Sequence, residues 1–299
     1  TQSLTRLACT IFTYKSERYS HFHTKKQGLL LTEQAPPPCP QPARKKLADR
    51  IPPMHPILIL KTGCTFAETA SRQGDFEDWL IQGLGLTLAP HIVLFPSRAD
   101  RLPPPDHFSG IIITGSHAML TRGLPWMLQT ADWLAQLPQS PVPVLGICFG
   151  HHLLARALGG EVRDHPLGEE IGPVSVQTAR AAGSDPLLHG FCPGFSAYAA
   201  HSQSASVLPP GAVLLAGNNW EPHHAFRYGD RIWGLQFHPE FSGETIRDYR
   251  EERSKDTPNG ADFFPGDPVE AEVNGRVILR RYAEVVLRVE RTREKGEHP

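Results

Sequence analysis

Short apolar runs alternate with amphipathic segments along the chain from residue 57 onward. Apolar runs of strand length, bounded by glycine and proline, are typical of parallel strands buried on both faces. The segments between them carry apolar residues at helical spacing. This alternation predicts an α/β fold with helices on both faces of a parallel sheet. The predicted strands are Ile57–Leu60, His91–Phe95, Gly110–Thr114 and Val142–Ile147, and the predicted helices are Asp75–Leu84 and Pro125–Leu137.

The second half of the chain changes character. From Glu161 to about Trp233 it consists of short, turn-rich, strand-like pieces, which indicate a small antiparallel extension of the sheet. A helix is expected over Ser242–Arg250, followed by a polar loop over Asp256–Pro268. A last helix is expected from Val269 to about Val289.

The first 53 residues mix scattered polar residues with a proline-rich run over residues 35–42, and they show no lasting period. Such a composition predicts disorder. Met54 directly precedes the first strand, so one hypothesis is that the natural protein starts there; a genuine flexible tail is the alternative. We therefore expect a disordered N-terminal extension over residues 1–53, one domain over 54–290 and a charged tail over 291–299.

Charge and cysteine content narrow the class of protein. Thirty basic and 31 acidic residues leave a formal charge of -1, which predicts neither nucleic-acid nor membrane-surface binding. No apolar run approaches the roughly 18 residues of a membrane-spanning helix. Five scattered cysteines without C-x-x-C spacing favour a reducing compartment, and no secretory signal pattern is present. We expect a cytoplasmic protein.

Cys148 stands at the centre of the strongest local motif. An apolar strand runs into Gly146-Ile147-Cys148-Phe149-Gly150, and a helix-forming stretch follows at once. Two glycines allow a sharp strand-to-helix turn that exposes the residue between them, as in a nucleophile elbow. The helix N-terminus favours thiolate, and the Phe149 N–H is placed to donate to an oxyanion. A buried structural cysteine is the alternative interpretation.

His238 and Glu240 form a second candidate pair in Gln236-Phe237-His238-Pro239-Glu240. Pro239 argues against a helix, and residues i and i+2 of an extended strand share a face. Glu240 would then orient His238 as a base for the cysteine. Nucleophile, base and orienting group are the minimum set for thiol acyl transfer.

The two motifs, in this order, resemble those of the class I (triad-type) glutamine amidotransferases, and the similarity spans roughly residues 57 to 250. The resemblance implies a flavodoxin-like domain that hydrolyses the side-chain amide of L-glutamine to glutamate and ammonia through a cysteine thioester. No cofactor is implied. Gly110-Ile111-Ile112-Ile113-Thr114-Gly115-Ser116 matches the family's oxyanion loop, so Gly115 and Ser116 would join Phe149 in stabilising the oxyanion.

The family also implies substrate-binding residues, and here the sequence departs from its pattern. The residue four positions after the nucleophile is commonly Gln in the family and is His152 here. His201-Ser202-Gln203 replaces the family's His-Ser-Asp, and Glu170 lies in a loop that lines the pocket in these proteins. His152, Glu170, His201, Ser202 and Gln203 are therefore the expected substrate-binding residues, and the substrate is left open.

Three functions stay open at this point. The first is a stand-alone glutamine amidotransferase, which would pass ammonia to a separate synthetase chain or act as a hydrolase in its own right. The second is a γ-glutamyl hydrolase or transferase acting on another small γ-glutamyl compound. The third is a degenerate binding or regulatory module. No metal site is expected, because adjacent histidines such as His151-His152 and His223-His224 diverge on a helix or strand.

Overall fold

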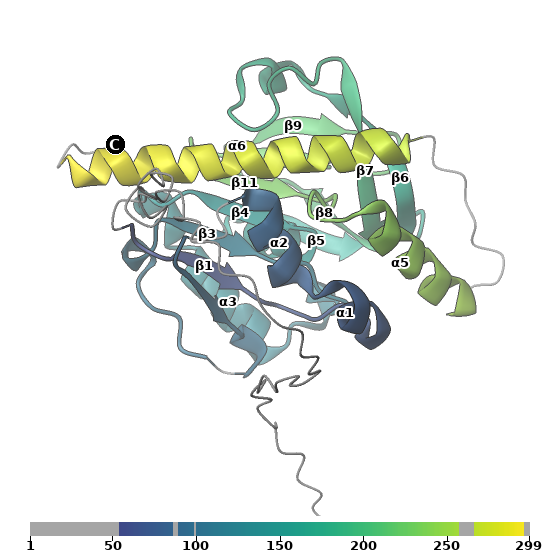
Figure 1. Ribbon diagram of the computed structural model, residues 1–299, viewed down its shortest axis with the longest axis horizontal. Coiled ribbons are helices and arrows are strands. Elements are labelled where there is room, and N and C mark those ends of the chain that lie inside the picture. Colours follow the sequence, from purple (N-terminus) through teal and green to yellow (C-terminus); the bar gives the residue numbers. More distant parts are fainter. Residues whose placement is uncertain (1–53, 86–88, 99, 257–265, 296–299) are drawn as a thin grey trace, which may run out of the picture. The chain divides into compact units, whose positions relative to one another are not determined.

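The computed structural model describes residues 54–85, 89–98, 100–256 and 266–295. The predicted disorder of residues 1–53 lies outside these ranges. Within them, the chain forms an α/β domain built on one nine-stranded sheet (Figure 1). No helix in the described ranges has the length and apolar character that crossing a membrane requires.

Five strands at one side of the sheet are parallel. Four of them match the predicted apolar runs, and the fifth, Ile232–Leu235, was not predicted as a parallel strand. Each of the three central runs is buried along its whole length, which explains its uniformly apolar sequence. The strands lie in the order β2 (His91–Leu94), β1 (Ile57–Leu60), β3 (Gly110–Ile113), β4 (Val144–Ile147) and β11 (Ile232–Leu235).

The β2 strand differs from the prediction of a strand buried on both faces. It lies at the edge of the sheet and pairs with β1 alone, and Ile92 is 42 % exposed. An apolar run therefore does not distinguish a central strand from an edge strand, because that difference depends on the strand order.

The predicted antiparallel extension is confirmed, and four of its strands continue the main sheet beyond β11. These are β10 (Ala225–Tyr228), β9 (Val213–Gly217), β6 (Glu170–Thr178) and β7 (Gly194–His201). A separate two-stranded sheet pairs β5 (Glu161–Asp164) with β8 (Gln203–Val207).

Helices cover the two faces of the parallel half. α2 (Phe76–Leu84) and α6 (Pro268–Glu294) pack with one apolar cluster, and Figure 1 shows α6 running along the sheet. α3 (Pro125–Leu134) and α4 (Phe149–Ala157) pack with the other. Successive strand residues alternate between the clusters, as the two-residue period of a strand requires.

Two further helices pack against each other, and the second of them also packs near β6 and β7. α5 (Gly243–Asp256) begins where a helix was expected but ends at Asp256 instead of Arg250, and the sequence does not predict α1 (Ala67–Gln73). α1 has seven residues and buries only Thr69, so it carries no apolar period. The two helices pack against each other, and the Thr69 hydroxyl donates to Asp248 of α5.

The last helix is longer than predicted. α6 ends at Glu294 instead of near Val289, so it includes the first residues of the expected charged tail. Arginine and glutamate are good helix formers, and Arg291 and Arg293 in the last turn interact favourably with the helix dipole. Charge alone therefore did not mark the end of the helix.

Candidate active site

Cys148 occupies the turn between β4 and α4. Its φ angle is +50°, and among the described residues it is the only non-glycine residue with a positive φ. Such a backbone conformation costs free energy and persists only where the surrounding structure imposes it. The side chain is 94 % buried, and its Sγ lies 3.7 Å from the carbonyl oxygen of Ala200.

Two glycines make this turn sterically feasible. A Cβ on Gly146 would lie 2.5 Å from the carbonyl oxygen of Gly150, and a Cβ on Gly150 would lie 2.4 Å from that of Ile113. Both distances are shorter than atoms tolerate, so α4 packs this closely on β3 and β4 only because side chains are missing at these positions. The close approach places Cys148 at the N-terminal end of α4.

The Nδ1 atom of His238 lies 2.8 Å from Oε1 of Glu240, and both side chains are buried. The contact was expected along one face of a strand, but it forms in a different way. β11 ends at Leu235, and His238–Phe241 forms a turn in which the Phe241 N–H donates to the His238 carbonyl over 3.4 Å. Pro239 at the second position of a turn is favoured, so the pair meets across a turn and not along one strand face.

Burial and neighbouring groups act in opposite directions on the pKa of His238. Burial by itself lowers the pKa of His238, but the Glu240 carboxylate and Cys148 outweigh it and raise that pKa to about 10. The imidazole therefore carries a proton at neutral pH and faces both the sulfur and the carboxylate.

Aromatic packing holds the imidazole ring in place. The Phe241 ring stacks on that of His238 with centroids 4.0 Å apart, and Phe76 lies parallel at 6.3 Å. Gly115 also packs closely against the His238 ring, since a Cβ at Gly115 would lie 3.0 Å from Cε1 of His238. The expected oxyanion loop therefore reaches the expected base.

The loop after β3 and the start of α4 approach each other at Cys148. The Ser116 hydroxyl donates to the Thr62 carbonyl over 3.1 Å, which anchors the loop to the chain after β1. Within the described part of the chain, the backbone N–H groups of Ser116 and Phe149 have no hydrogen-bond partner. Both remain available as donors to a ligand.

A cavity of about 360 Å³ opens beside Cys148. Its wall brings together most of the residues that the sequence predicts for the site, although they come from separate segments. These are Ser116, Cys148, Phe149, His152, His201, Ser202 and Gln203.

The side chains of Gln203 and His152 already have protein partners. The Gln203 amide donates to Thr121 and Asp164, and its oxygen accepts from the Leu120 N–H. Nε2 of His152 lies 2.6 Å from the side-chain oxygen of Gln236, and burial lowers the pKa of His152 to about 3. His152 is therefore a neutral part of the wall.

Glu170 does not line the cavity, contrary to the expectation from its loop. It is fully buried and contacts His201, His224 and Asn218, whereas its neighbour Glu169 lines the cavity. Glu170 is the first residue of β6, and successive residues of a strand point to opposite faces. The loop was located correctly, but the side chain that reaches the cavity is the adjacent one.

Sequence reasoning also missed one side of the cavity. Phe66, His117 and Tyr249 form an aromatic cluster there, with neighbouring ring centroids 4.5 to 5.5 Å apart. Arg253 lines the same cavity and pairs with Glu169 over 2.8 Å. The available signal was the four-residue spacing of Tyr249 and Arg253 on α5, which places both on one helix face.

The site combines a strained cysteine at a strand–helix turn with a neighbouring histidine–carboxylate pair, and it is carried by an α/β sheet. This combination is typical of proteins with a nucleophile elbow. The chain belongs to the class I glutamine amidotransferase family, because the family model for glutamine amidotransferase class-I matches residues 75–251. Members of this family and the curated relatives of the chain are amidotransferases and hydrolases.

Among those relatives is the γ-glutamyl-L-1-hydroxyisopropylamide hydrolase of a Pseudomonas species, 31 % identical over 56 % of this chain and 62 % of that protein. A glutamine-hydrolysing GMP synthase subunit of Methanosarcina acetivorans is 31 % identical over 44 % of this chain and 65 % of that protein. The chain thus spans less than two thirds of each relative. A glutamine amidotransferase structure from Methylobacillus flagellatus aligns with a TM-score of 0.60 and 26 % identity, covering 82 % of this chain and 96 % of that one.

Proposed function

We propose that the chain hydrolyses the side-chain amide of L-glutamine, with Cys148 as nucleophile, His238 as acid and base, and Glu240 as the group that orients His238. The observation that carries the proposal is the strained Cys148 elbow, which lies on a cavity and beside a buried His238–Glu240 pair. These three groups meet the needs of thiol acyl transfer.

The reaction proceeds in two halves. The Cys148 thiolate adds to the amide carbon, and the N–H groups of Ser116 and Phe149, with Gly115 in the same loop, stabilise the oxyanion. Protonated His238 gives its proton to the leaving nitrogen, so ammonia departs and a γ-glutamyl thioester remains. Neutral His238 then takes a proton from water, the hydroxide displaces the sulfur, and glutamate is released.

The charged pair at the cavity supplies a means of recognising the substrate. A γ-glutamyl group carries an α-carboxylate and an α-ammonium, and Arg253 and Glu169 offer the complementary charges beside each other. Both are partly exposed, so each can exchange its partner for the substrate at little cost. His152, His201, Ser202 and Gln203 shape the rest of the wall in this proposal.

An ammonia-release assay with L-glutamine tests the proposed reaction. Cys148→Ala should abolish turnover, whereas Cys64→Ser, which changes an exposed free cysteine, should leave it intact. A glutamine-like electrophile should label Cys148 and be blocked by the substrate. Equal turnover in Cys148→Ala and the wild type would refute the assignment of the nucleophile.

A second candidate is hydrolysis of a γ-glutamyl amide with a larger amine. His152 in place of the family's usual Gln, the aromatic side of the cavity and the Pseudomonas relative support it. We predict that His152→Gln raises kcat/KM for L-glutamine relative to that for a γ-glutamyl N-alkylamide. Steady-state kinetics with both substrates measures the ratio, and an unchanged ratio would remove His152 from the specificity argument.

The ammonia produced has two possible fates in this proposal. The similarity to a GMP synthase subunit from Methanosarcina acetivorans supports transfer to a separate synthetase chain. Turnover of L-glutamine by the isolated chain at a rate that no added protein increases would favour a hydrolase in its own right.

A further inference from the structure

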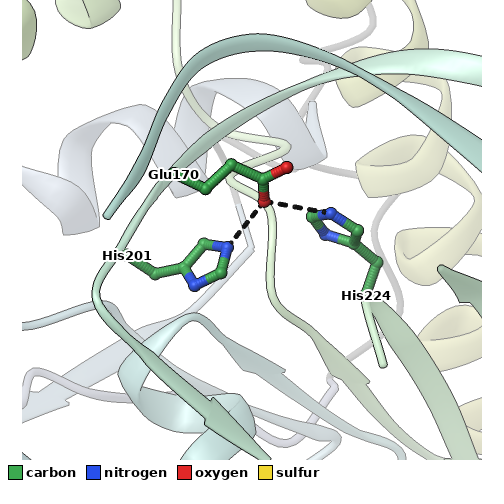
Figure 2. A group of neighbouring side chains, drawn as sticks. All are labelled: Glu170, His201 and His224. Carbon is green, nitrogen blue, oxygen red and sulfur yellow. Dashed lines mark hydrogen bonds and ion pairs between the residues drawn. The ribbon is translucent and has the colours of Figure 1, made fainter. Parts of the chain in front are cut away.

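Three buried side chains, Glu170, His201 and His224, converge on one another (Figure 2), and His201 also lines the cavity. Glu170 begins β6, His201 ends β7, and His224 directly precedes β10. Oε2 of Glu170 lies 2.8 Å from Nε2 of His201 and 3.1 Å from Nε2 of His224. One ligand atom from each residue lies within 4.8 Å of the other two.

These distances are close to those within a single metal coordination sphere. Zinc binds imidazole nitrogen and carboxylate oxygen at about 2.0 to 2.2 Å, which separates neighbouring ligand atoms by about 3 to 3.5 Å. Outward movements of a few tenths of an ångström would therefore open the site to an ion. The sheet supplies two of the three positions, because Glu170 and His201 are register partners of β6 and β7.

Outer hydrogen bonds orient two of the ligands. Nδ1 of His201 lies 3.0 Å from the backbone oxygen of Gln203 and can donate to it, which leaves Nε2 to face Glu170. The Asn218 side chain donates to Oε1 of Glu170 over 2.8 Å and leaves Oε2 for the cluster. Metal ligands are commonly held by such outer partners.

The third member, His224, contacts Glu170 and the rings of His201 and Phe237. Its side chain is fully buried, and neither ring nitrogen makes a hydrogen bond within the described residues, although Nε2 is at ion-pair distance from Glu170. A buried imidazole without a hydrogen bond is costly unless an ion or water satisfies it. A cation bound between Nε2 of His224 and Oε2 of Glu170 would satisfy both groups.

We propose that Glu170, His201 and His224 bind one divalent metal ion of the zinc type. Two imidazoles and one carboxylate match zinc, whereas magnesium and calcium prefer oxygen ligands alone. The fourth position would hold water. The sequence suggests no metal site because adjacent histidines diverge, but the fold takes one histidine from each of two separate segments.

The ion would act on the shape of the cavity and not on the reaction. His201 lines the cavity, and the preceding residue, Ala200, carries the carbonyl that contacts Sγ of Cys148. An ion at the cluster would tie β6, β7 and the chain before β10 together at this wall. It lies apart from the Cys148–His238–Glu240 set, so the proposal does not depend on the function proposed above.

Zinc uptake by the untagged full-length chain tests the site. Cys148→Ser serves as the background, because a thiolate beside an imidazole also binds zinc. After dialysis against zinc and then buffer, elemental analysis should find about one equivalent per chain, and zinc should raise Tm, since a ligand of the folded state stabilises it. His224→Gln and Glu170→Gln should lose both effects.

His223→Gln is the matched control. His223 is next to His224 and half-buried, but its ring bonds to the Ala205 carbonyl and is not part of the cluster. This variant should keep the zinc and the rise in Tm. Equal uptake by His224→Gln and His223→Gln would overturn the proposal.

Two further outcomes decide the case without reliance on the variants. If the background protein takes up no zinc, nickel or manganese and its Tm does not respond to them, a proton occupies the cluster and the proposal is wrong. If the His224 variant fails to fold, X-ray absorption of the zinc-loaded background protein decides. Imidazole and oxygen scattering without sulfur supports the site, and sulfur ligation refutes it.

Discussion

Single residues determine how closely α4 approaches the sheet, and Gly150 is the most sensitive of them. We predict that Gly150→Ala destabilises the protein by about 1 to 3 kcal/mol, because its methyl group would overlap the Ile113 carbonyl. Gly183→Ala is the control, since no heavy atom lies within 4 Å of the added Cβ. Urea unfolding of both variants measures the difference, and equal midpoints would contradict the close contact.

The His238–Glu240 pair should make stability depend on pH in a defined window. The folded pKa of His238 is about 10, above the value of about 6.5 for an unfolded histidine. The folded state therefore binds this proton more tightly, and the stabilisation is complete below pH 6.5 and is lost as the pH rises through about 10.

Glu240→Gln removes the charge that raises this pKa and should flatten the decline in unfolding free energy between pH 6.5 and 10. Urea titrations across this range measure the slope. Glu284→Gln, an exposed position on α6, serves as the control and should keep the wild-type slope. The prediction fails if Glu240→Gln and Glu284→Gln show the same dependence.

At the scale of elements, α6 begins with a side-chain cap. The Asp267 carboxylate accepts from the N–H groups of Val269 and Glu270 and satisfies two donors of the first turn. We predict that Asp267→Ala lowers the unfolding free energy by about 1 kcal/mol. Thermal unfolding of both variants measures the loss. The control is Glu284→Ala, which removes an exposed carboxylate from the middle of the same helix, so a larger loss in Asp267→Ala is due to the cap and not to the change of charge.

The elements that carry the site were predicted with different success. β4 and α4 were expected around Cys148 because the apolar run and the G-x-C-x-G motif are local signals. The turn at His238–Phe241 was not, because a short extended stretch and a turn share the same residues. The α5 helix was expected, but its contribution of Tyr249 and Arg253 to the cavity depends on how α5 packs near β6, which no local pattern encodes.

At the scale of the whole molecule, Tyr282 ties the last helix to the central strands. Its buried hydroxyl lies 2.8 Å from the Ile111 carbonyl and 2.9 Å from that of Pro143. We predict that Tyr282→Phe costs about 1 kcal/mol, the usual contribution of one such hydrogen bond. Tyr228→Phe is the control, because the Tyr228 hydroxyl has no hydrogen bond within the described residues; equal midpoints in urea would contradict the prediction.

The sequence by itself predicted the class of fold and the family, and it supplied Cys148, His238 and Glu240 as the proposed catalytic set, because these predictions rest on patterns within neighbouring positions. Only the tertiary structure decided that Glu169 and not Glu170 reaches the cavity, and that Glu170, His201 and His224 meet. The physical reason is register. Which residues of separate strands face one another depends on strand order and pairing across the sheet, and a shift by one position moves a side chain to the opposite face.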